Sequence, residues 1–396
     1  MKDLYFVESV KHFDNKTTAL LLYIPENIRD WENKNRDFKW FVRTEVLARE
    51  AETIREGAYV YSIGREDGYV PANEDERVLR INKRSDRLLN ILHNRLQNEY
   101  VFSYKNVNTL YSYHINVGHG NHSLIVFNAD DKFHIWMVDC SDYDFVSHRY
   151  YQDNIKTCIE HIQDKFGLKN MHIEAVMLTH PHYDHYSGIG YYIDNGMIDR
   201  GSIFYINLKC NIESHNFNNL LTKIDTLGSS IIEPFSCNSG GNIQILYPDN
   251  PTFTNHNLTL NNMSSVYNIC FDDVSYFVFP GDLETEGWNL MNTTACAPYM
   301  RNTRYYAISH HGSINGHLRN FECNKKIGHI INSIKDCLSP TTVPVLMGRD
   351  KAFSGIYSAN VINDFRGRIV YSEKNPANNK VRFLEIDLLS SNKMWY

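Results

Sequence analysis

The sequence has no long apolar run that could cross a membrane. Its longest early apolar stretch, ALLLYI at residues 19–24, is the size of a strand, whereas a membrane helix needs about 20 apolar residues. The opening residues, MKDLYFVESVKHFDNKTT, are too polar for a secretory signal. These two absences predict a protein that does not enter a membrane and that stays in the cytoplasm.

The sequence also lacks closely spaced cysteines. Disulfide frameworks and thiolate zinc sites both depend on recurring short cysteine spacings. Here the cysteines are scattered along the chain, at positions 140, 158, 210, 237, 270, 296, 323 and 337. We therefore expect reduced thiols, which agrees with a cytoplasmic location.

An excess of positive charge is missing as well. The formal net charge of −6 argues against a general basic coat for nucleic acid, although a local basic groove stays open. Arg77, Arg80, Arg84 and Arg87 recur at helical spacing. A solvated helix face paired with nearby acids explains them more readily than a phosphate-binding stripe does.

The chain divides into two regions with different patterns. Residues 1–108 predict a small α+β appendage, and its boundary falls at about residue 105–108. The appendage is expected to hold strands at 18–24 and 58–63, a helix with Phe38, Phe41, Val42, Val46 and Leu47 on one face, and a helix over 84–98. The appendage could bind a protein partner or influence the choice of substrate.

Residues 109–396 predict paired strands followed by strand–helix alternation. Ile155, Cys158, Ile159, Ile162 and Phe166 indicate a helix that ends at Gly167. Mixed sheets covered by helices fit this order. The expected strands cover the stretches LYSYHINVGHGNHSLIVFN, KFHIWMVDC and HIEAVMLTH, and residues 203–207, 243–247, 265–271, 274–279, 304–309, 343–347, 368–372 and 381–388.

The stretch THPHYDHYSG at residues 179–188 follows one of these buried strands. It contains His180, His182, Asp184 and His185 within six positions. Imidazole nitrogen and carboxylate oxygen are ligands of zinc, and a turn that leaves a strand can direct several of them inward. A surface loop that is merely rich in histidine is the alternative, and this density of ligand types makes it the less favoured one.

Two further strands end on residues of the same kind. FVFPGDLE at 277–284 ends on Asp282, and YAISHHGS at 306–313 ends on His310 and His311. A single strand-end aspartate is usually a turn former. Strand ends align along one edge of a sheet, however, so three such ends together predict one metal centre.

On these motifs the chain resembles metallo-β-lactamase-fold hydrolases, whose H-x-H-x-D-H motif it carries from His180 to His185. Within that superfamily it is most similar to the metallohydrolase domain of the DNA-uptake protein ComEC and to phosphorylcholine esterases. The resemblance covers about residues 112–315. It rests on INVGHGNHSLIV, MVDCSD, LTHPHYDHYSG, NNMSSVYNICF, FPGDLE and ISHHGS, in that order.

The resemblance implies a four-layer αββα sandwich over residues 109–396, with two zinc ions at the sheet edge. It assigns His180 and His182 to the first metal, Asp184 and His185 to the second, and Asp282 to a bridging position. Adjacent histidines such as His310 and His311 can serve one metal each. Manganese or iron would fit similar ligands.

Other positions bear on this ligand set without joining it. The resemblance gives Asp139 the role of orienting a ligand. His215 is the nearest candidate for the third-motif histidine of the family, and we expect it to be a loop residue. The DVGQGD of the family is NVGHGN here, with Asn116 and Asn121 in place of carboxylates, and DKAFSGIYSANV lacks the C-terminal histidine common in ComEC-like domains. These departures leave the metal prediction intact but leave the substrate and the leaving-group acid open.

The resemblance thus implies a phosphodiesterase or nuclease in which a hydroxide bridging the metals attacks, with Asp184 and Asp282 as the catalytic carboxylates. Nucleic acid or a nucleotide would be the substrate. Tyr183, Tyr186, Tyr191 and Tyr192 could stack on bases, or could simply pack. Two alternatives remain: a metallohydrolase of a lactone, lactam or thioester, and a non-catalytic metal-binding scaffold.

Overall fold

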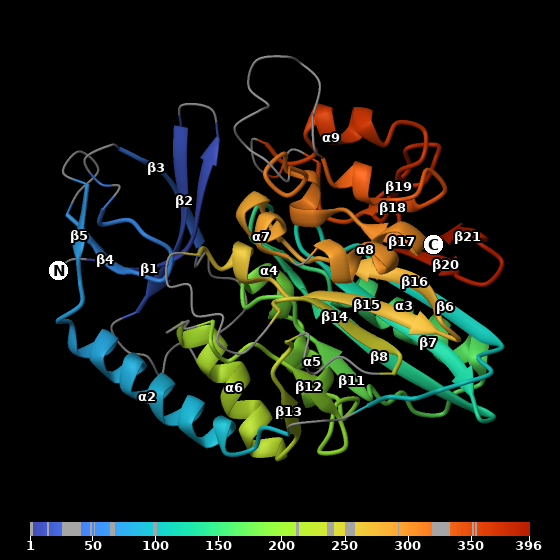
Figure 1. The fold of residues 1–396 in the computed structure, drawn as a ribbon. Helices are drawn as coiled ribbons and strands as arrows, with labels where there is room; N and C mark the ends of the chain where they lie inside the picture. Colours follow the sequence, from blue (N-terminus) through green and yellow to red (C-terminus); the bar gives the residue numbers. More distant parts are fainter. Residues whose placement is uncertain are drawn as a thin grey trace. The chain divides into compact units, whose positions relative to one another are not determined.

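The structure is a computed structural model of the whole chain. It describes residues 3–13, 16–25, 41–47, 50, 52–63, 68–97, 101–210, 214–235, 241–249, 258–291, 293–318, 333–350, 352 and 355–396. Its helices and strands are labelled in Figure 1.

The chain folds into two compact units. The first unit consists of Met1–Asn94 and Asn211–Thr226, and the second of Arg95–Cys210 and Leu227–Tyr396. The chain therefore passes between the units three times. A return of the chain to the first unit at residue 211 is not expected from the sequence, and the predicted domain division at residue 108 stays a prediction.

The first unit is built on a five-stranded antiparallel sheet in the order β3-β2-β1-β4-β5. Its apolar core includes Val7, Ala19, Leu21, Val46 and Val60, which come from four different strands. Strand β1 is not predicted from the sequence, and it pairs with both β2 and β4. The strands are β1 (Asp3–Phe13), β2 (Lys16–Ile24), β3 (Phe41–Val46), β4 (Tyr59–Ser62) and β5 (Tyr69–Pro71).

The helix predicted around residues 38–47 is wrong, because residues 41–46 form strand β3. Val42, Thr44 and Val46 are β-branched and alternate along the chain, which suits a pleated strand better than a helix. The strand pairs with β2 from Leu22↔Phe41 to Thr17↔Val46. Phe38 lies outside the described residues.

The described part of the first unit also contains the helices α2 and α6. Helix α2 (Glu76–His93) begins eight residues before its predicted start at 84, because the Asp75 side chain accepts a hydrogen bond from the Arg77 amide and caps it. Helix α6 (His215–Leu227) contacts α2 through Ser85 Oγ, which donates to Asn218 Oδ1 at 2.9 Å.

Three of the four arginines of α2 form contacts inside the first unit. Arg77 and Arg80 form ion pairs with Asp75 and Glu76, and Arg84 donates to Thr222. These contacts agree with the solvated, paired helix face favoured from the sequence.

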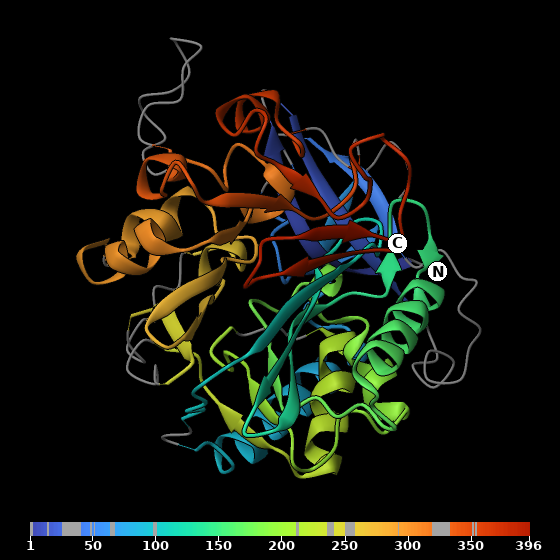
Figure 2. The ribbon, with the colours of Figure 1, turned by 90° about the vertical axis from the view of Figure 1, so that its right-hand side faces the viewer.

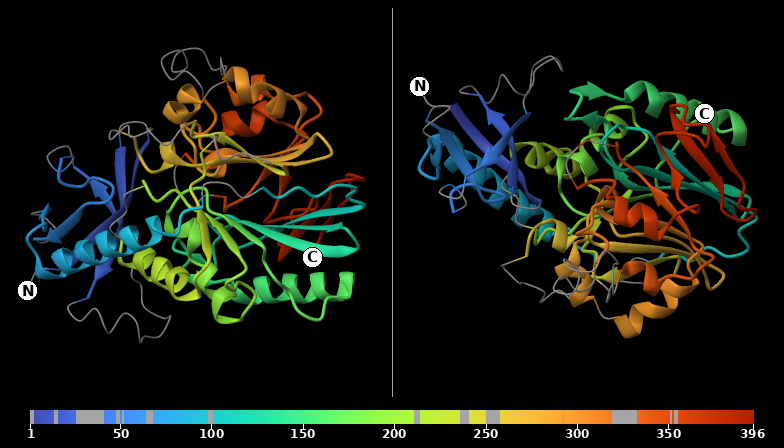
Figure 3. Two further views of the ribbon diagram at one scale, coloured as in Figure 1. Left: turned by 60° about the horizontal axis from the view of Figure 1, so that its bottom comes forward. Right: turned by 90° about the horizontal axis from the view of Figure 1, so that it is seen from above.

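The second unit is an αββα sandwich of two sheets with helices outside them, as the sequence predicts. The first sheet has the order β13-β12-β11-β8-β7-β6-β20-β21, and the second β14-β15-β16-β17-β18-β19. Trp136, Phe127, Phe271, Tyr267 and Phe277 belong to the apolar core shared by the two sheets. Figure 3, left, shows the two sheets as separate layers, with the green helix α3 beneath one and the orange helices above the other.

The strands of the first sheet are β6 (Thr109–Ile115), β7 (His122–Ala129), β8 (Lys132–Cys140), β11 (Ala175–Met177), β12 (Ile203–Tyr205), β13 (Ser230–Ile232), β20 (Phe383–Asp387) and β21 (Lys393–Trp395). Those of the second are β14 (Ile243–Tyr247), β15 (Val266–Phe271), β16 (Val274–Phe279), β17 (Tyr305–Ala307), β18 (Val343–Leu346) and β19 (Val370–Tyr371). A separate short pair is formed by β9 (Tyr143–Asp144) and β10 (Arg149–Tyr150).

Helix α3 (Gln152–Phe166) follows the predicted pattern. Ile155, Cys158 and Ile162 are buried, and Gly167 ends the helix with a φ of 66°, a left-handed conformation that glycine adopts without strain. Figure 2 shows this helix in green beside the strands of the first sheet. The outer helices of the second sheet include α7 (Thr285–Leu290), α8 (Thr293–Asn302) and α9 (Ala359–Asp364).

Parallel pairing brings four strand ends to one edge of the sandwich. Strand β11 runs parallel to β8, and β17 runs parallel to β16. The carboxyl ends of parallel neighbours leave a sheet on the same side, where sites commonly form. The predicted ligands follow β11, β16 and β17, and Asp139 lies at the end of β8. Of the described helices, none is both long and apolar enough to span a bilayer.

Candidate metal centre

The histidine turn leaves β11 and enters a short helix. Thr179 and His180 follow the strand, and α4 (Tyr183–Tyr186) carries Asp184 and His185. Asp184 and His185 are both buried, with 6% and 0% of their surface exposed. Charged groups are rarely buried to this extent unless a partner compensates them. The turn is therefore not the histidine-rich surface loop considered as the alternative.

Asp139 fixes the orientation of this turn. Its carboxylate, at the end of β8, accepts hydrogen bonds from the Thr179 amide at 2.8 Å and from the Thr179 hydroxyl at 2.9 Å. It also lies 2.8 Å from His185 Nδ1. Since Nδ1 is engaged by Asp139, the other ring nitrogen, Nε2, is directed toward the centre, which is the way metal-binding imidazoles are held.

The loop after β16 brings Asp282 to the same place. Gly281 has a φ of 58°, and a Cβ at this position would lie 2.4 Å from Thr179 Oγ1. Glycine is therefore required for the close approach of the two loops. The approach leaves Asp282 2% exposed beside the histidine turn.

The loop after β17 supplies His310 and His311 from a left-handed turn. Both residues have positive φ values, 48° and 49°, which cost energy for side chains other than glycine. The His310 amide donates to the Gly281 carbonyl at 3.1 Å, and Ser309 Oγ donates to the Leu283 carbonyl at 2.7 Å. These bonds tie the His310–His311 turn to the loop that carries Asp282.

Asp184, His185, Asp282 and His311 form a group that could hold a metal ion. Their ligand atoms all lie within 4.8 Å of one another. His185 Nε2 is 3.3 Å from Asp282 Oδ1 and 4.0 Å from Asp184 Oδ1. His311 Nε2 is 3.5 Å from Asp184 Oδ2 and 3.6 Å from Asp282 Oδ2.

These separations suit a zinc-type ion. Zinc bonds to nitrogen and carboxylate oxygen are about 2.1 Å long, so atoms at the corners of a tetrahedron around zinc are about 3.4 Å apart. Three buried atoms of the group make no hydrogen bond within the described part of the chain: His185 Nε2, His311 Nε2 and Asp282 Oδ1. Atoms of this kind are costly to bury without a partner, so the residues fit a bound cation.

The pKa shifts of the buried carboxylates also favour a bound cation. Burial opposes ionisation of Asp282, but His311, His185 and His310 outweigh it and hold the pKa of this carboxyl well below its usual range. The pKa of Asp184 is also held well below its usual range, because the effect of burial is outweighed mainly by His185. Burial also opposes the charge on His185, and the Asp282, Asp139 and Asp184 carboxylates together raise its pKa well above the ordinary value. The site thus keeps two buried anions that need positive charge beside them.

His180 and His182 lie next to this group as a pair. His180 Nε2 is 2.9 Å from His182 Nδ1, and the His180 ring centroid is 4.2 Å from that of His185. Burial, helped by the neighbouring His185 and His182, lowers the pKa of His180 well below its usual value. A neutral imidazole retains the lone pair that a metal requires.

His310 also lies beside Asp282, facing the same carboxylate oxygen as His311. Its Nε2 is 3.7 Å from Asp282 Oδ2, and its Nδ1 is 3.1 Å from Glu284 Oε1. The seven predicted ligands therefore gather at one edge of the sandwich, with four of them in the compact group and His180, His182 and His310 around it. Glu284, which the sequence analysis did not single out, contacts this set through His310.

His119 is a second residue that sequence reasoning missed. It follows β6, is fully buried, and places Nε2 3.4 Å from Asp184 Oδ2. Its ring centroid is 4.3 Å from that of His311. The available signal was its position between two glycines in NVGHGN, at the end of a strand. The comparison of this motif considered only the missing carboxylates.

The other candidate residues lie outside the metal-binding group or only pack around it. His215 was expected to be a loop residue, but it is the first residue of α6 in the first unit. Burial lowers the pKa of His215 to about 4. Asn116 bonds to the backbone at Val381 and Gly118. Tyr186 and Tyr192 are buried, so packing rather than base stacking accounts for them.

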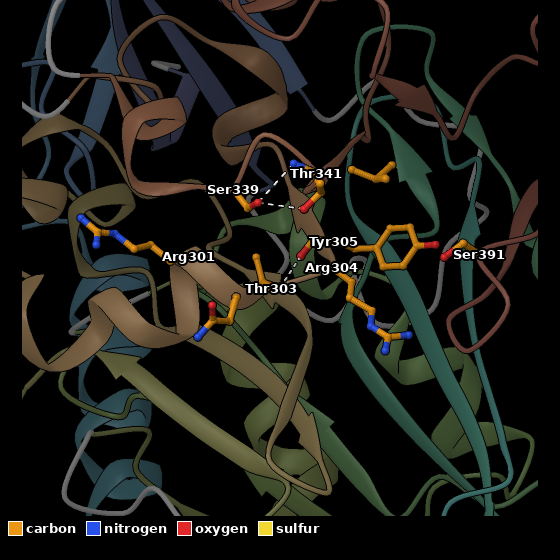
Figure 4. Close-up of a pocket in the computed structure, with 9 residues that line it drawn as sticks. Arg301, Thr303, Arg304, Tyr305, Ser339, Thr341 and Ser391 are labelled. Carbon is orange, nitrogen blue, oxygen red and sulfur yellow. Dashed lines mark hydrogen bonds between the residues drawn. The ribbon is translucent and has the colours of Figure 1, made fainter.

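A separate cavity of about 330 Å³ lies at the opposite ends of β17 and β18. Figure 4 shows that the side chains of Arg301 and Arg304 point away from each other, while Ser339 and Thr341 are hydrogen-bonded. The cavity holds none of the predicted ligands. Its lining residues are Arg301, Asn302, Thr303, Arg304, Tyr305, Ser339, Thr341, Val343 and Ser391.

Comparison with known proteins gives one family match. Residues 154–201 match the model of the metallo-beta-lactamase superfamily, a stretch that includes most of α3, all of β11 and the histidine turn. Among curated proteins, no sequence matches the chain.

Solved structures with a similarity include the metallo-beta-lactamase fold protein YhfI from Bacillus subtilis, at 14% identity, with a TM-score of 0.36 and coverage of 66% of this chain and 95% of that one. A long form RNase Z from yeast is similar at 12% identity, with a TM-score of 0.29 and coverage of 63% of this chain and 41% of that one. The segment that matches the metallo-beta-lactamase superfamily, residues 154–201, lies within the αββα sandwich and contains the histidine turn.

Proposed function

We propose that the protein is a binuclear metal-dependent hydrolase that cleaves phosphodiester bonds. The observation that carries this proposal is the buried group of Asp184, His185, Asp282 and His311. It combines two ionised carboxylates with imidazole nitrogens at spacings that suit a metal ion. A retired site would be expected to have lost at least one of these ligands, so a non-catalytic scaffold is the weaker alternative.

In the proposed ligand assignment, Asp184, His185 and His311 hold one ion. His180, His182 and His310 hold the other, and Asp282 is shared between the two. The Nε2 atoms of His310 and His311 lie 3.7 Å and 3.6 Å from Asp282 Oδ2, and we assign one of these histidines to each ion. Zinc is the favoured metal because the set is rich in imidazole, with manganese or iron as substitutes.

When bound, the two cations would polarise a phosphoryl oxygen and make a water molecule more acidic. The protein supplies the geometry for this chemistry. Asp139 holds His185 in one orientation, the Gly281 loop brings Asp282 against the histidine turn, and the buried walls exclude bulk water. Preorganised groups of this kind need not rearrange as charge develops in the transition state.

The phosphodiester is proposed from the resemblance to ComEC-like domains and phosphorylcholine esterases. It makes DNA, RNA or a nucleotide the substrate class. A lactone, lactam or thioester would use the same metal ligands, so the bond cleaved must be decided by assay.

Two measurements together test the proposal. Elemental analysis of protein prepared without chelator should find close to two transition-metal ions per chain. Protein at that occupancy should release p-nitrophenol from bis(p-nitrophenyl) phosphate and should cleave at least one of linear DNA, RNA or a cyclic nucleotide. Occupancy near zero after reconstitution with zinc or manganese would refute the metal centre. Hydrolysis confined to lactone or cephalosporin reporters would refute the phosphodiester.

The first unit has a separate proposed role. None of the proposed ligands lies in it, so we propose that it selects a substrate or a protein partner. We also propose a cytoplasmic location, supported by the six cysteines within the described residues, all of which are free thiols.

A further inference from the structure

Arg349, after β18, and Asp144, in β9, form an ion pair near the metal centre. Arg349 Nη1 donates to Asp144 Oδ2 at 2.9 Å. The Asp144 side chain is fully buried, whereas 40% of the Arg349 side chain is exposed. The pair therefore has a buried anchor and an accessible cation.

Both residues lie beside histidines of the centre. Arg349 follows Gly348, where an added Cβ would be 2.7 Å from His311 Nδ1. On the other side, an added Cβ at Gly118, which precedes His119, would be 2.6 Å from Asp144 Oδ2. The His119 and His311 rings are themselves 4.3 Å apart, so the ion pair joins the segments that flank these two histidines.

Asp144 binds only one of the N–H groups of the Arg349 guanidinium. The Asp144 carboxylate also accepts hydrogen bonds from the Val146 amide at 2.8 Å and from Ser147 Oγ at 2.6 Å, so it is a fixed acceptor. Among the described residues Asp144 is the hydrogen-bond partner of Arg349, and that bond uses one of five N–H donors. Within the described residues the other N–H donors of Arg349 have no acceptor, so they can bind a ligand.

We infer that Arg349 binds a phosphate oxygen of the substrate and selects an anionic phosphodiester over a neutral ester. This inference rests on the proposed function, whose metal centre it extends. A guanidinium recognises phosphate through paired N–H donors, and one already fixed by a buried carboxylate loses less conformational entropy on binding. Carboxylates share this chemistry, so the test must separate the two anions.

The test compares Arg349→Gln with Arg349→Lys and with the control Arg304→Gln. Arg304 precedes β17 at the far side of the sheet, in the cavity of Figure 4, and should have no role. Binding of inorganic phosphate to the metal-loaded protein is measured by titration calorimetry. Hydrolysis is measured with bis(p-nitrophenyl) phosphate, neutral p-nitrophenyl acetate and a cephalosporin that carries a carboxylate.

Arg349→Gln should raise the Kd of phosphate and the KM of the diester by roughly 10-fold or more, the scale of one charge-assisted hydrogen bond. The metal content and the rate of hydrolysis of the neutral ester should be unchanged. Arg349→Lys should recover part of the loss, and Arg304→Gln should match the parent protein.

Three results would overturn the inference. Unchanged phosphate binding in Arg349→Gln would show that no anion contacts this side chain. Equal losses for all three substrates, together with lower metal content, would make the pair a structural link only. A larger loss for the cephalosporin than for the diester would identify a carboxylate site. Phosphate binding is measured without turnover, so it decides on Arg349 even if the parent protein cleaves no phosphodiester and the proposed function fails.

Discussion

Replacing Asp282 by asparagine should be more damaging than any single histidine substitution. Its carboxylate oxygens lie 3.3 Å from His185 Nε2, 3.6 Å from His311 Nε2 and 3.7 Å from His310 Nε2, so it stands between both proposed halves of the ligand set. The amide has the same shape as the carboxylate but no charge. The fold should therefore survive while the centre loses one of its two anions.

The expected size of the effect follows from these distances. Two unit charges about 4 Å apart interact by about 4 kcal/mol at an effective dielectric of about 20. At about 1.4 kcal/mol for each tenfold change, the loss of one such interaction weakens metal binding by about 10³-fold. The rate of hydrolysis should fall by roughly 10²-fold or more, the scale of losing one key electrostatic stabiliser.

The matched control is Asp364→Asn. Asp364 also pairs with a buried histidine, His317, at 2.9 Å, but it lies outside the metal-binding group. Both variants are checked for folding by circular dichroism, for bound metal by elemental analysis, and for hydrolysis of bis(p-nitrophenyl) phosphate. An Asp282→Asn protein that keeps two ions and full activity would refute the assignment of Asp282 as the shared ligand.

Three further outcomes are expected. His119→Ala should lower metal occupancy without unfolding the protein, because His119 lies 3.4 Å from Asp184; unchanged occupancy on elemental analysis would remove it from the site. Asp75→Ala should lower the free energy of unfolding by about 1 kcal/mol through loss of the α2 cap, whereas Glu76→Gln, which breaks only an exposed ion pair, should cost less in the same denaturant titration. His114 is fully buried, and burial lowers its pKa to about 3, so the unfolded chain binds a proton between pH 6.5 and 3 that the folded chain does not. Its contribution to the free energy of unfolding should therefore fall by about 1.4 kcal/mol per pH unit as the pH drops through that window. His114→Gln should flatten the dependence measured between pH 7 and pH 5, and an equally steep dependence in the variant would contradict this origin.

The predicted ligands could be found from the sequence because each follows an apolar strand. A strand end is a local signal, and parallel pairing turns several such ends into one site. The same reasoning placed α3, whose apolar residues recur at helical spacing up to Gly167.

The sequence was less informative where the structure depends on distant partners. The stretch around Phe41–Val46 has apolar residues at a spacing compatible with a helix, but pairing with β2 makes it a strand. His119 carries no strong local signal, since its role depends on the approach of the β6–β7 loop to Asp184. His215 lies near the family motif in sequence, yet its helix belongs to the first unit.

The return of the chain at α6 has a consequence for synthesis of the protein. Residues 1–94 are synthesised before residues 211–226 of the same unit, and most strands of the first sheet of the sandwich are made between the two. At about 5–20 residues per second, the delay is on the order of ten seconds. During that time Ser85 and Arg84 of α2 have no α6 to contact. The nascent chain therefore holds an N-terminal unit that still lacks α6 while the histidine turn is already being made.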